Sequence, residues 1–295
     1  MAKVIGGLST SHVPMIGRAI AGKKQQEVSF APFFESFSKV HDWLGDARPD
    51  VVVVIYNDHG LNFFLDNMPT FAIGAAHAYH NADEGWGPPE PRVFKGAAEL
   101  SWHVVKSLVA DEFDVSTCQE MLFDHAGITA LDLLWPERGE LPVAVIPVVV
   151  NGVLPPLPTP QRCYAFGQAL GRALRSFPKD LKVMVVGSGG LSHELGQTGK
   201  INEKFDAFCM DKIVNDPEAL TRFTNDEIVD LAGAQGLELM TWVVMRGAVS
   251  GEVDVVQSLY HAPISHTGGA MMLLDSRAQN EASEESAEQR EHAHG

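Results

Sequence analysis

The sequence predicts an α/β fold: a single domain built on a mixed, largely parallel sheet flanked by helices. Two observations support this class. Short apolar runs rich in β-branched residues recur along the 295-residue chain, and segments with helical periodicity lie between them. A chain of this length buries roughly three quarters of the surface that its unfolded form exposes, so it needs no disulfide or structural metal to fold.

The expected strands are apolar throughout, which is typical of strands buried on both faces of a sheet. They are residues 4–8, 51–56, 70–74, 143–150 and 182–187. The segments with helical periodicity are residues 33–44, 97–110, 163–176 and 201–213. Two Gly- and Pro-rich segments, 81–93 and 151–162, are expected to form ordered loops over the ends of the sheet.

The composition changes near the C-terminal end. Residues 1–276 are expected to form one domain, and residues 277–295 an acidic, disordered tail. Five glutamates outweigh two arginines in this tail, and large apolar residues are absent from it, so it cannot bury enough surface to fold.

The chain carries 22 basic and 38 acidic residues, which gives a formal net charge of −16. Such a surface repels phosphate backbones and anionic lipid headgroups, so nucleic-acid and membrane-surface roles are disfavoured. The longest apolar stretch, 141–157, is interrupted by four prolines and is too short to span a bilayer. The first residues lack the apolar region of a signal peptide, so a cytoplasmic protein is expected.

Four histidines occupy similar places in the predicted fold. His12, His59 and His193 each lie a few residues beyond an expected strand, and His125 lies in a polar turn before a helical segment. Ligands of open α/β sheets bind in the crevice outside the carboxyl ends of the strands. We therefore expect these four side chains to converge.

A single histidine of this kind is as readily explained as a hydrogen-bonded loop residue, but four in one setting favour a site. Other histidines lack this setting. His41 and His103 are expected on helix faces, and His77 and His80 at a strand end, so they are interpreted as structural.

Glu238 is the other unusual residue, because residues 237–248 form a helical pattern that is apolar nearly all round and therefore buried. A buried carboxylate is costly unless it is paired or binds a metal. Pairing with Arg246 fits poorly, because eight residues separate the two by about two helical turns. A second alternative is a carboxylate favoured by the helix dipole. We favour metal ligation.

Two imidazoles and one carboxylate on one face of a metal form the facial triad of non-haem Fe(II) oxygenases. Here the triad would be His12, His59 and Glu238, which leaves His193 and His125 for proton transfer. The residues alone leave zinc possible as the metal, and they leave open which two histidines bind it.

Two other classes of site are disfavoured. The segment GSGGLS lacks the lysine of a P-loop and the GxGxxG spacing of a dinucleotide site. No serine has the GxSxG spacing of a nucleophile elbow, so serine hydrolase chemistry is unsupported.

The motifs TSHVP, YNDH, FDH, GSGGLSH and GLELMTW resemble, in order and approximate spacing, the class III (LigB-type) extradiol ring-cleavage dioxygenases. The resemblance runs from residue 1 to about residue 275. The segments PTFAIG, ADEGWGP and MRGA look most like the catalytic β subunits of protocatechuate 4,5-dioxygenases, with gallate and methylgallate dioxygenases as close relatives.

This resemblance implies Fe(II) bound by His12, His59 and Glu238, with His193 as the acid/base catalyst and His125 as a second pocket histidine near substrate and oxygen. The implied reaction is meta cleavage of protocatechuate by O2 to 4-carboxy-2-hydroxymuconate semialdehyde, in the degradation of aromatic acids. Both oxygen atoms would enter the product.

The resemblance also implies where the substrate carboxylate binds, at Ser265, His266 and Thr267. His266 departs from the asparagine expected there, so gallate and 3-O-methylgallate are alternative substrates. Some gallate dioxygenases resemble this chain fused to a small extra domain. We therefore expect a separate small α subunit that covers the active site, in an α2β2 assembly.

Two readings from other classes compete with the dioxygenase. A zinc hydrolase could use the same residues, since zinc accepts a His, His, Glu ligand set and activates water. A non-catalytic binding protein could share the fold, because fold alone does not establish function. The complete set of histidines argues against the second reading.

Overall fold

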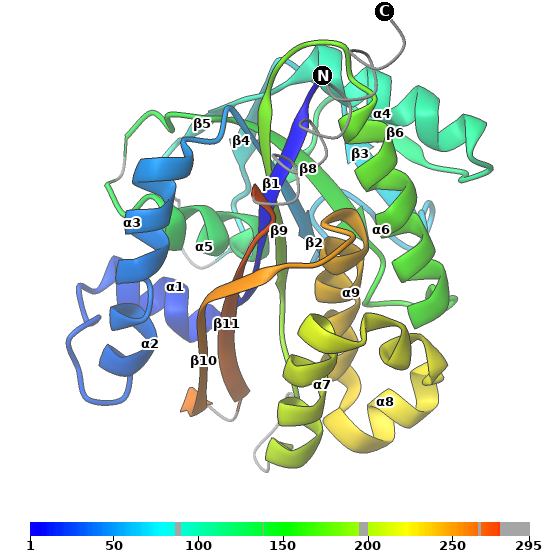
Figure 1. Ribbon diagram of the computed structural model, residues 1–295. Helices are drawn as coiled ribbons and strands as arrows, with labels where there is room; N and C mark the ends of the chain where they lie inside the picture. The colour runs from blue at the N-terminus through cyan, green and yellow to red at the C-terminus, as the bar shows by residue number, and fades with distance from the viewer. Residues whose placement is uncertain (86–89, 138, 195–199, 265–266, 278–295) are drawn as a thin grey trace, which may run out of the picture.

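The computed structural model describes residues 1–85, 90–137, 139–194, 200–264 and 267–277. These residues form an eight-stranded sheet, which lies at the centre of the molecule (Figure 1). The strands follow the order β10 (Asp254–Ile264), β11 (Thr267–Asp275), β1 (Lys3–Ser11), β9 (Lys182–Gly189), β2 (Val51–Tyr56), β8 (Ala144–Val150), β3 (Phe71–Gly74) and β6 (Ser116–Cys118). A small second sheet contains β5 (Val93–Lys95), β4 (Ala78–Asn81) and β7 (Leu122–Phe123).

The sheet is mixed, as expected. Its central strands β1, β9, β2 and β8 are parallel neighbours, whereas β11 is antiparallel to β1 and β3 is antiparallel to β8. The fold class predicted from the sequence is therefore confirmed.

Helices cover both faces of the sheet (Figure 1). One face packs against α4 (Ala98–Ala110), α6 (Pro160–Arg175), α7 (Glu203–Asn215) and α9 (Leu239–Ala248). The other packs against α1 (Pro14–Ala21), α2 (Ala31–Glu35), α3 (Ser38–Ala47) and α5 (His125–Leu134). Strand β2 shows why its sequence is apolar throughout, because alternate side chains enter opposite cores: Val51, Val53 and Ile55 on one side, and Val52, Val54 and Tyr56 on the other.

All five expected strands form, and the four helical segments form with adjusted ends. Residues 33–44 divide into α2 and α3, because the Ser36 hydroxyl donates to the Phe33 carbonyl at 2.6 Å and competes with the helical backbone pattern. Helix α6 begins at Pro160, earlier than expected, because the Thr159 hydroxyl caps it by accepting from the Arg162 amide.

The sequence interpretation missed the hairpin of β10 and β11, which extends the sheet beside β1. The bulges in β10, where its register with β11 shifts, interrupt the alternation that identifies a strand in a sequence. Helix α8 (Asn225–Ala232) and the 3-10 helices η1 (Pro217–Arg222) and η2 (Ala234–Glu238) complete the described elements.

Among the described residues, no helix combines the length and apolarity needed to cross a bilayer. Residues 278–295, which make up nearly all of the expected acidic tail, lie outside the described residues. Residues 265 and 266, two of the three expected substrate contacts, also lie outside them.

Candidate active site and metal centre

The carboxylate of Glu238 meets three imidazoles at the carboxyl edge of the parallel strands. Its Oε2 lies 3.5 Å from Nε2 of His12 and 3.6 Å from Nε2 of His193, and its Oε1 lies 3.9 Å from Nε2 of His59. His12 directly follows β1, and His59 and His193 follow β2 and β9. The parallel order of these strands therefore brings together residues that are far apart in the sequence.

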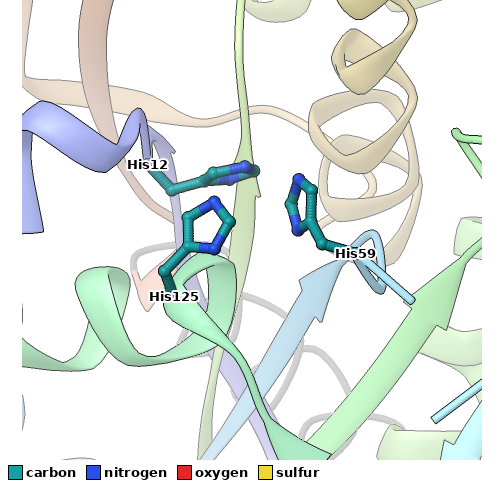
Figure 2. Close-up of side chains that lie close together, drawn as sticks. All are labelled: His12, His59 and His125. Atoms are coloured by element: carbon teal, nitrogen blue, oxygen red, sulfur yellow. The ribbon is translucent and has the colours of Figure 1, made fainter. Parts of the chain in front are cut away.

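His125, the first residue of α5, joins the same group. Figure 2 shows the rings of His12, His59 and His125 facing one another, two from loops that follow strands and one from the start of α5. Each offers a nitrogen within 4.8 Å of the others, a spacing that could hold a metal ion. The rings of His59 and His125 are closest, with 4.3 Å between centroids. Sequence reasoning expected His125 near the substrate, and the structure also places it among the possible metal donors.

Asp124 orients His59. Its Oδ2 accepts hydrogen bonds from the backbone amide and from Nδ1 of His59, both at 2.9 Å. The next residue, Gly60, has φ of +81°, a conformation that favours glycine and turns the chain away from the site. With its proton on Nδ1, a neutral His59 carries its lone pair on Nε2, the atom that faces Glu238.

Ser188 orients His12 in a similar way. The Ser188 hydroxyl donates to the carbonyl of Ala126 at 2.6 Å, so its oxygen is left to accept from Nδ1 of His12 at 3.2 Å. The lone pair of a neutral His12 therefore also lies on Nε2, toward Glu238.

Hydrogen bonds from Nδ1 orient the remaining two histidines in the same way. Nδ1 of His193 donates to the Leu191 carbonyl at 2.8 Å, and Nδ1 of His125 donates to a Glu84 oxygen at 2.6 Å. Glu84 also accepts from the His125 backbone amide at 2.7 Å. All four imidazoles are thus fixed with the proton on Nδ1, the arrangement by which proteins prepare Nε2 as a metal ligand or proton acceptor.

These donors fit a cation. Lone pairs on three Nε2 atoms and a carboxylate repel one another unless positive charge lies between them. Although burial opposes ionisation, His12 and His193 hold the pKa of Glu238 well below its usual range. Burial alone would lower the pKa of His59, but Asp124 and Glu238 raise it to about 8. Contacts with Glu238 likewise outweigh burial and raise the pKa of His193, whereas burial lowers the pKa of His12. The ionised Glu238 therefore favours positive charge close to it, and a divalent ion would supply that charge.

Glu238 is the last residue of η2 and directly precedes α9, so α9 begins slightly later than the sequence predicted. Its carboxylate makes no capping hydrogen bond to α9, which disfavours a role as a simple helix-start carboxylate. Arg246 instead donates to the carbonyls of Ile213 and Gly251, so the alternative ion pair does not form.

The glycines of GSGGLSH create space for this site. A Cβ on Gly190 would lie 2.5 Å from Cε1 of His193 and 3.0 Å from Oε2 of Glu238. A Cβ on Gly189 would lie 2.4 Å from the Glu238 carbonyl. The motif is glycine-rich because the end of β9 passes directly beside the buried acid.

A second buried carboxylate ties the His193 loop to the C-terminal hairpin. Asp206 accepts from the amide and hydroxyl of Ser192 at 2.8 and 2.6 Å, and from the Tyr260 hydroxyl at 2.8 Å. His193 itself forms an isolated antiparallel bridge with Thr267. Thr267, the described member of the expected substrate contacts, therefore lies beside the expected acid/base residue.

The donors open into a cavity of about 790 Å³, a size typical of small-molecule sites. Its polar lining includes the four histidines and Glu238, and its apolar lining includes Val13, Met15, Leu157, Val229 and Leu237. Two charged residues on its walls were not expected from the sequence, Arg18 on α1 and Asp226 on α8.

Sequence reasoning also missed Glu84, Asp124 and Ser188, which orient the histidines. One signal for Asp124 was available, since an Asp that precedes a helical segment is a preferred N-cap. No local pattern indicates that Glu84 or Ser188 contacts a histidine far away in the chain.

Comparisons with known proteins agree with this geometry. The chain is 42% identical to a gallate dioxygenase of Pseudomonas putida over 200 residues, which cover 67% of this chain and 58% of that enzyme. It is 27% identical to a 2,3-dihydroxyphenylpropionate/2,3-dihydroxicinnamic acid 1,2-dioxygenase of a Rhodococcus species, covering 85% and 91% of the two chains. An uncharacterised Escherichia coli protein of known structure shares the fold, with a TM-score of 0.58, 14% identity and coverage of 92% and 98%.

A family model described as the catalytic LigB subunit of aromatic ring-opening dioxygenase matches residues 6–272. This span includes all four histidines and Glu238, and it confirms at the level of the family the enzyme class expected from the sequence. The chain belongs to the LigB family of catalytic subunits of aromatic ring-opening dioxygenases.

Proposed function

We propose that the protein is an Fe(II)-dependent extradiol dioxygenase that opens the ring of a gallate-like aromatic acid. The observation that carries this proposal is the meeting of four oriented imidazoles and the buried carboxylate of Glu238 at the wall of a ligand-sized cavity.

We assign the metal to His12, His59 and Glu238. This set supplies the two imidazoles and one carboxylate of a facial triad, and the pairwise spacing of its donors supports the assignment. Fe(II), when bound there, supplies the open coordination positions and electrons through which this chemistry brings a catechol and O2 together.

The chain's own residues would handle the protons. His193 would accept a phenolic proton at Nε2, because its Nδ1 is committed to the Leu191 carbonyl. Its loop is tied to the hairpin through Ser192 and Asp206, which would hold that nitrogen in place relative to the substrate. His125, held by Glu84, would serve as the second histidine near substrate and oxygen.

The relatives favour gallate over protocatechuate, the substrate that the sequence motifs first indicated. The relative named gallate dioxygenase is 42% identical, and the Rhodococcus relative named for 2,3-dihydroxyphenylpropionate and 2,3-dihydroxicinnamic acid is 27% identical. Each named compound is a carboxylic acid with adjacent ring hydroxyls. We propose that residues 265–267 contact the carboxylate, and the burial of Thr267 beside His193 supports this.

We further propose that a small α subunit covers the site, in an α2β2 assembly. The family is described as one of catalytic subunits, which supports a second component. Phe64 and Leu65, close to His59 in a neighbouring hollow, expose 55% and 87% of their surface and would suit an apolar contact.

Oxygen uptake tests the proposed function. The purified chain, alone and co-expressed with a candidate α subunit, is loaded anaerobically with Fe(II) and given gallate, protocatechuate or 3-O-methylgallate. We expect O2 consumption and a ring-opened product, with gallate the preferred substrate. No uptake with any of these catechols in either preparation would contradict the proposal.

Metal analysis separates the dioxygenase from a zinc hydrolase, and a binding assay separates it from a non-catalytic binding protein. Stoichiometric zinc without iron-dependent activity would favour a hydrolase. Tight binding of a catechol without turnover would favour a binding protein.

A further inference from the structure

We infer that Arg18 recognises the carboxylate of the substrate and so makes the cavity selective for aromatic acids over neutral catechols. This inference rests on the proposed function and adds to it a residue that sets substrate specificity.

The charges on the cavity wall indicate why such a residue is needed. The described lining residues include two carboxylates, Glu238 and Asp226, and one side chain with a permanent positive charge, Arg18. The chain as a whole has a formal net charge of −16. In the proposed site Fe(II) offsets Glu238, but Asp226 and the acidic chain would still repel an aromatic carboxylate unless a further cation faces it.

The position of Arg18 relative to the metal donors suits this role. Helix α1 begins at Pro14, two residues after His12, and Arg18 lies one turn further along, about 6 Å along the helix axis. In a hydroxylated benzoate the carboxylate lies across the ring from the hydroxyls that face the metal. A cation that lines the same cavity but lies further along α1 than His12 could meet that carboxylate.

The Arg18 side chain is exposed where it lines the cavity, so an entering ligand can reach it. Nη1 of Arg18 lies 4.0 Å from Sδ of Met15, three residues earlier on the same face of α1, and both residues line the cavity. Rotation about the long side chain would let the guanidinium meet an entering ligand. Since α1 starts two residues after His12, a helix fixes the backbone of Arg18 relative to this expected metal ligand.

The chemistry of Arg18 differs from that of the expected carboxylate contacts. Thr267 can donate one neutral hydrogen bond, which orients a carboxylate but supplies no charge to balance it. Arginine presents parallel N–H donors that match the two oxygens of a carboxylate. We infer that Arg18 supplies the charge and Thr267 the orientation.

Matched substrates test this inference. Gallate and its methyl ester carry the same hydroxyls, but the ester has no negative charge. For Arg18→Gln we expect kcat/KM for gallate to fall roughly tenfold or more, mainly through KM, while kcat/KM for methyl gallate changes less than about twofold. Arg18→Lys, which retains the charge but not the paired donors, should lose less. Arg172→Gln removes an arginine that pairs with Asp111 on the exposed surface, and it serves as the charge control.

The outcomes separate this inference from the proposed function. Equal losses for gallate and methyl gallate in a folded Arg18→Gln variant, or an equal loss in Arg172→Gln, would overturn the role of Arg18 alone. If Arg18→Gln does not fold, an Arg18→Lys variant with an unchanged preference for gallate over the ester would overturn it as well. Lack of turnover by the wild-type protein with both substrates would instead overturn the proposed function.

Discussion

One oxygen of Asp124 holds both the backbone amide and Nδ1 of His59, while its other oxygen accepts from the Ala126 amide and caps helix α5. Helix α5 begins with His125. A single buried carboxylate therefore orients one expected metal ligand and starts the helix that carries another pocket histidine. Metal binding and local stability should respond together when Asp124 is changed.

We expect Asp124→Ala to weaken Fe(II) binding about 10- to 100-fold, the usual effect of removing a partner of a ligating histidine. It should also lower the free energy of unfolding by about 1 kcal/mol or more through the lost cap. The amide of Asp124→Asn keeps only one acceptor oxygen, which can either hold His59 or cap the helix. We therefore expect a large loss in one of the two quantities, metal affinity or unfolding free energy, and a small loss in the other. Anaerobic metal titration and denaturant unfolding measure the two effects, and wild-type metal affinity in Asp124→Ala would contradict the prediction.

Glu238→Gln should abolish most metal binding, because it removes the negative charge that faces three imidazoles. We expect an affinity loss on the order of 100-fold or more, larger than that for an outer residue such as Asp124. The measurement is the Fe(II)-dependent rise in melting temperature, which follows from metal binding to the folded state.

Asp226→Asn is the matched control for Glu238→Gln, since it removes an equal charge from the wall of the same cavity. We expect this control to bind Fe(II) like the wild type. Equal metal affinity in Glu238→Gln and wild type would remove Glu238 from the ligand set.

His193→Gln should keep the metal and lose turnover, because its role is proton transfer rather than ligation. A lost general base typically reduces the rate about 10²- to 10⁴-fold. Bound iron is measured by metal analysis and the rate by O2 uptake on the same preparation. Loss of iron from His193→Gln would show that this histidine ligates.

His125→Gln distinguishes two ligand sets. If Glu238 completes the triad with His12 and His59, the variant should keep its iron to within about tenfold in affinity. Loss of iron comparable to that in His12→Gln would instead favour the group of three imidazoles formed by His12, His59 and His125.

Gly190→Ala should disrupt the site without removing any functional group. The added Cβ would lie 2.5 Å from His193 and 3.0 Å from Glu238, so one of these side chains must move. We expect a loss of about 1–3 kcal/mol in unfolding free energy, typical of overpacking, and at least a tenfold loss of kcat/KM.

Gly45→Ala is the control for Gly190→Ala, because an added Cβ at Gly45 in α3 meets nothing within 4 Å. A helix gains roughly 0.5–1 kcal/mol from such a change, so this variant should be slightly more stable and fully active. Wild-type activity in Gly190→Ala would count against the close packing of the GSGG segment around the site.

Much of the fold could be read from local patterns. Strand β2 is apolar at every position because both of its faces are buried, and that pattern is visible without a structure. The C-terminal hairpin was missed because the register shifts in β10 interrupt the alternation that would identify it. The division of residues 33–44 was missed because it depends on one hydroxyl of Ser36.

For the site, the sequence by itself determined the kinds of residue and where each stands relative to a strand end. His12, His59 and His193 follow parallel strands, and Glu238 stands out because a carboxylate within an apolar segment needs a partner. Only the tertiary structure decided which nitrogen of each ring faces the cavity, because Asp124, Ser188, Glu84 and the Leu191 carbonyl hold the Nδ1 atoms. It also decided that Arg18 reaches the cavity wall. Most of these contacts join residues that are distant along the chain. They form only when the strands pair in their final order, so no local sequence pattern can reveal them.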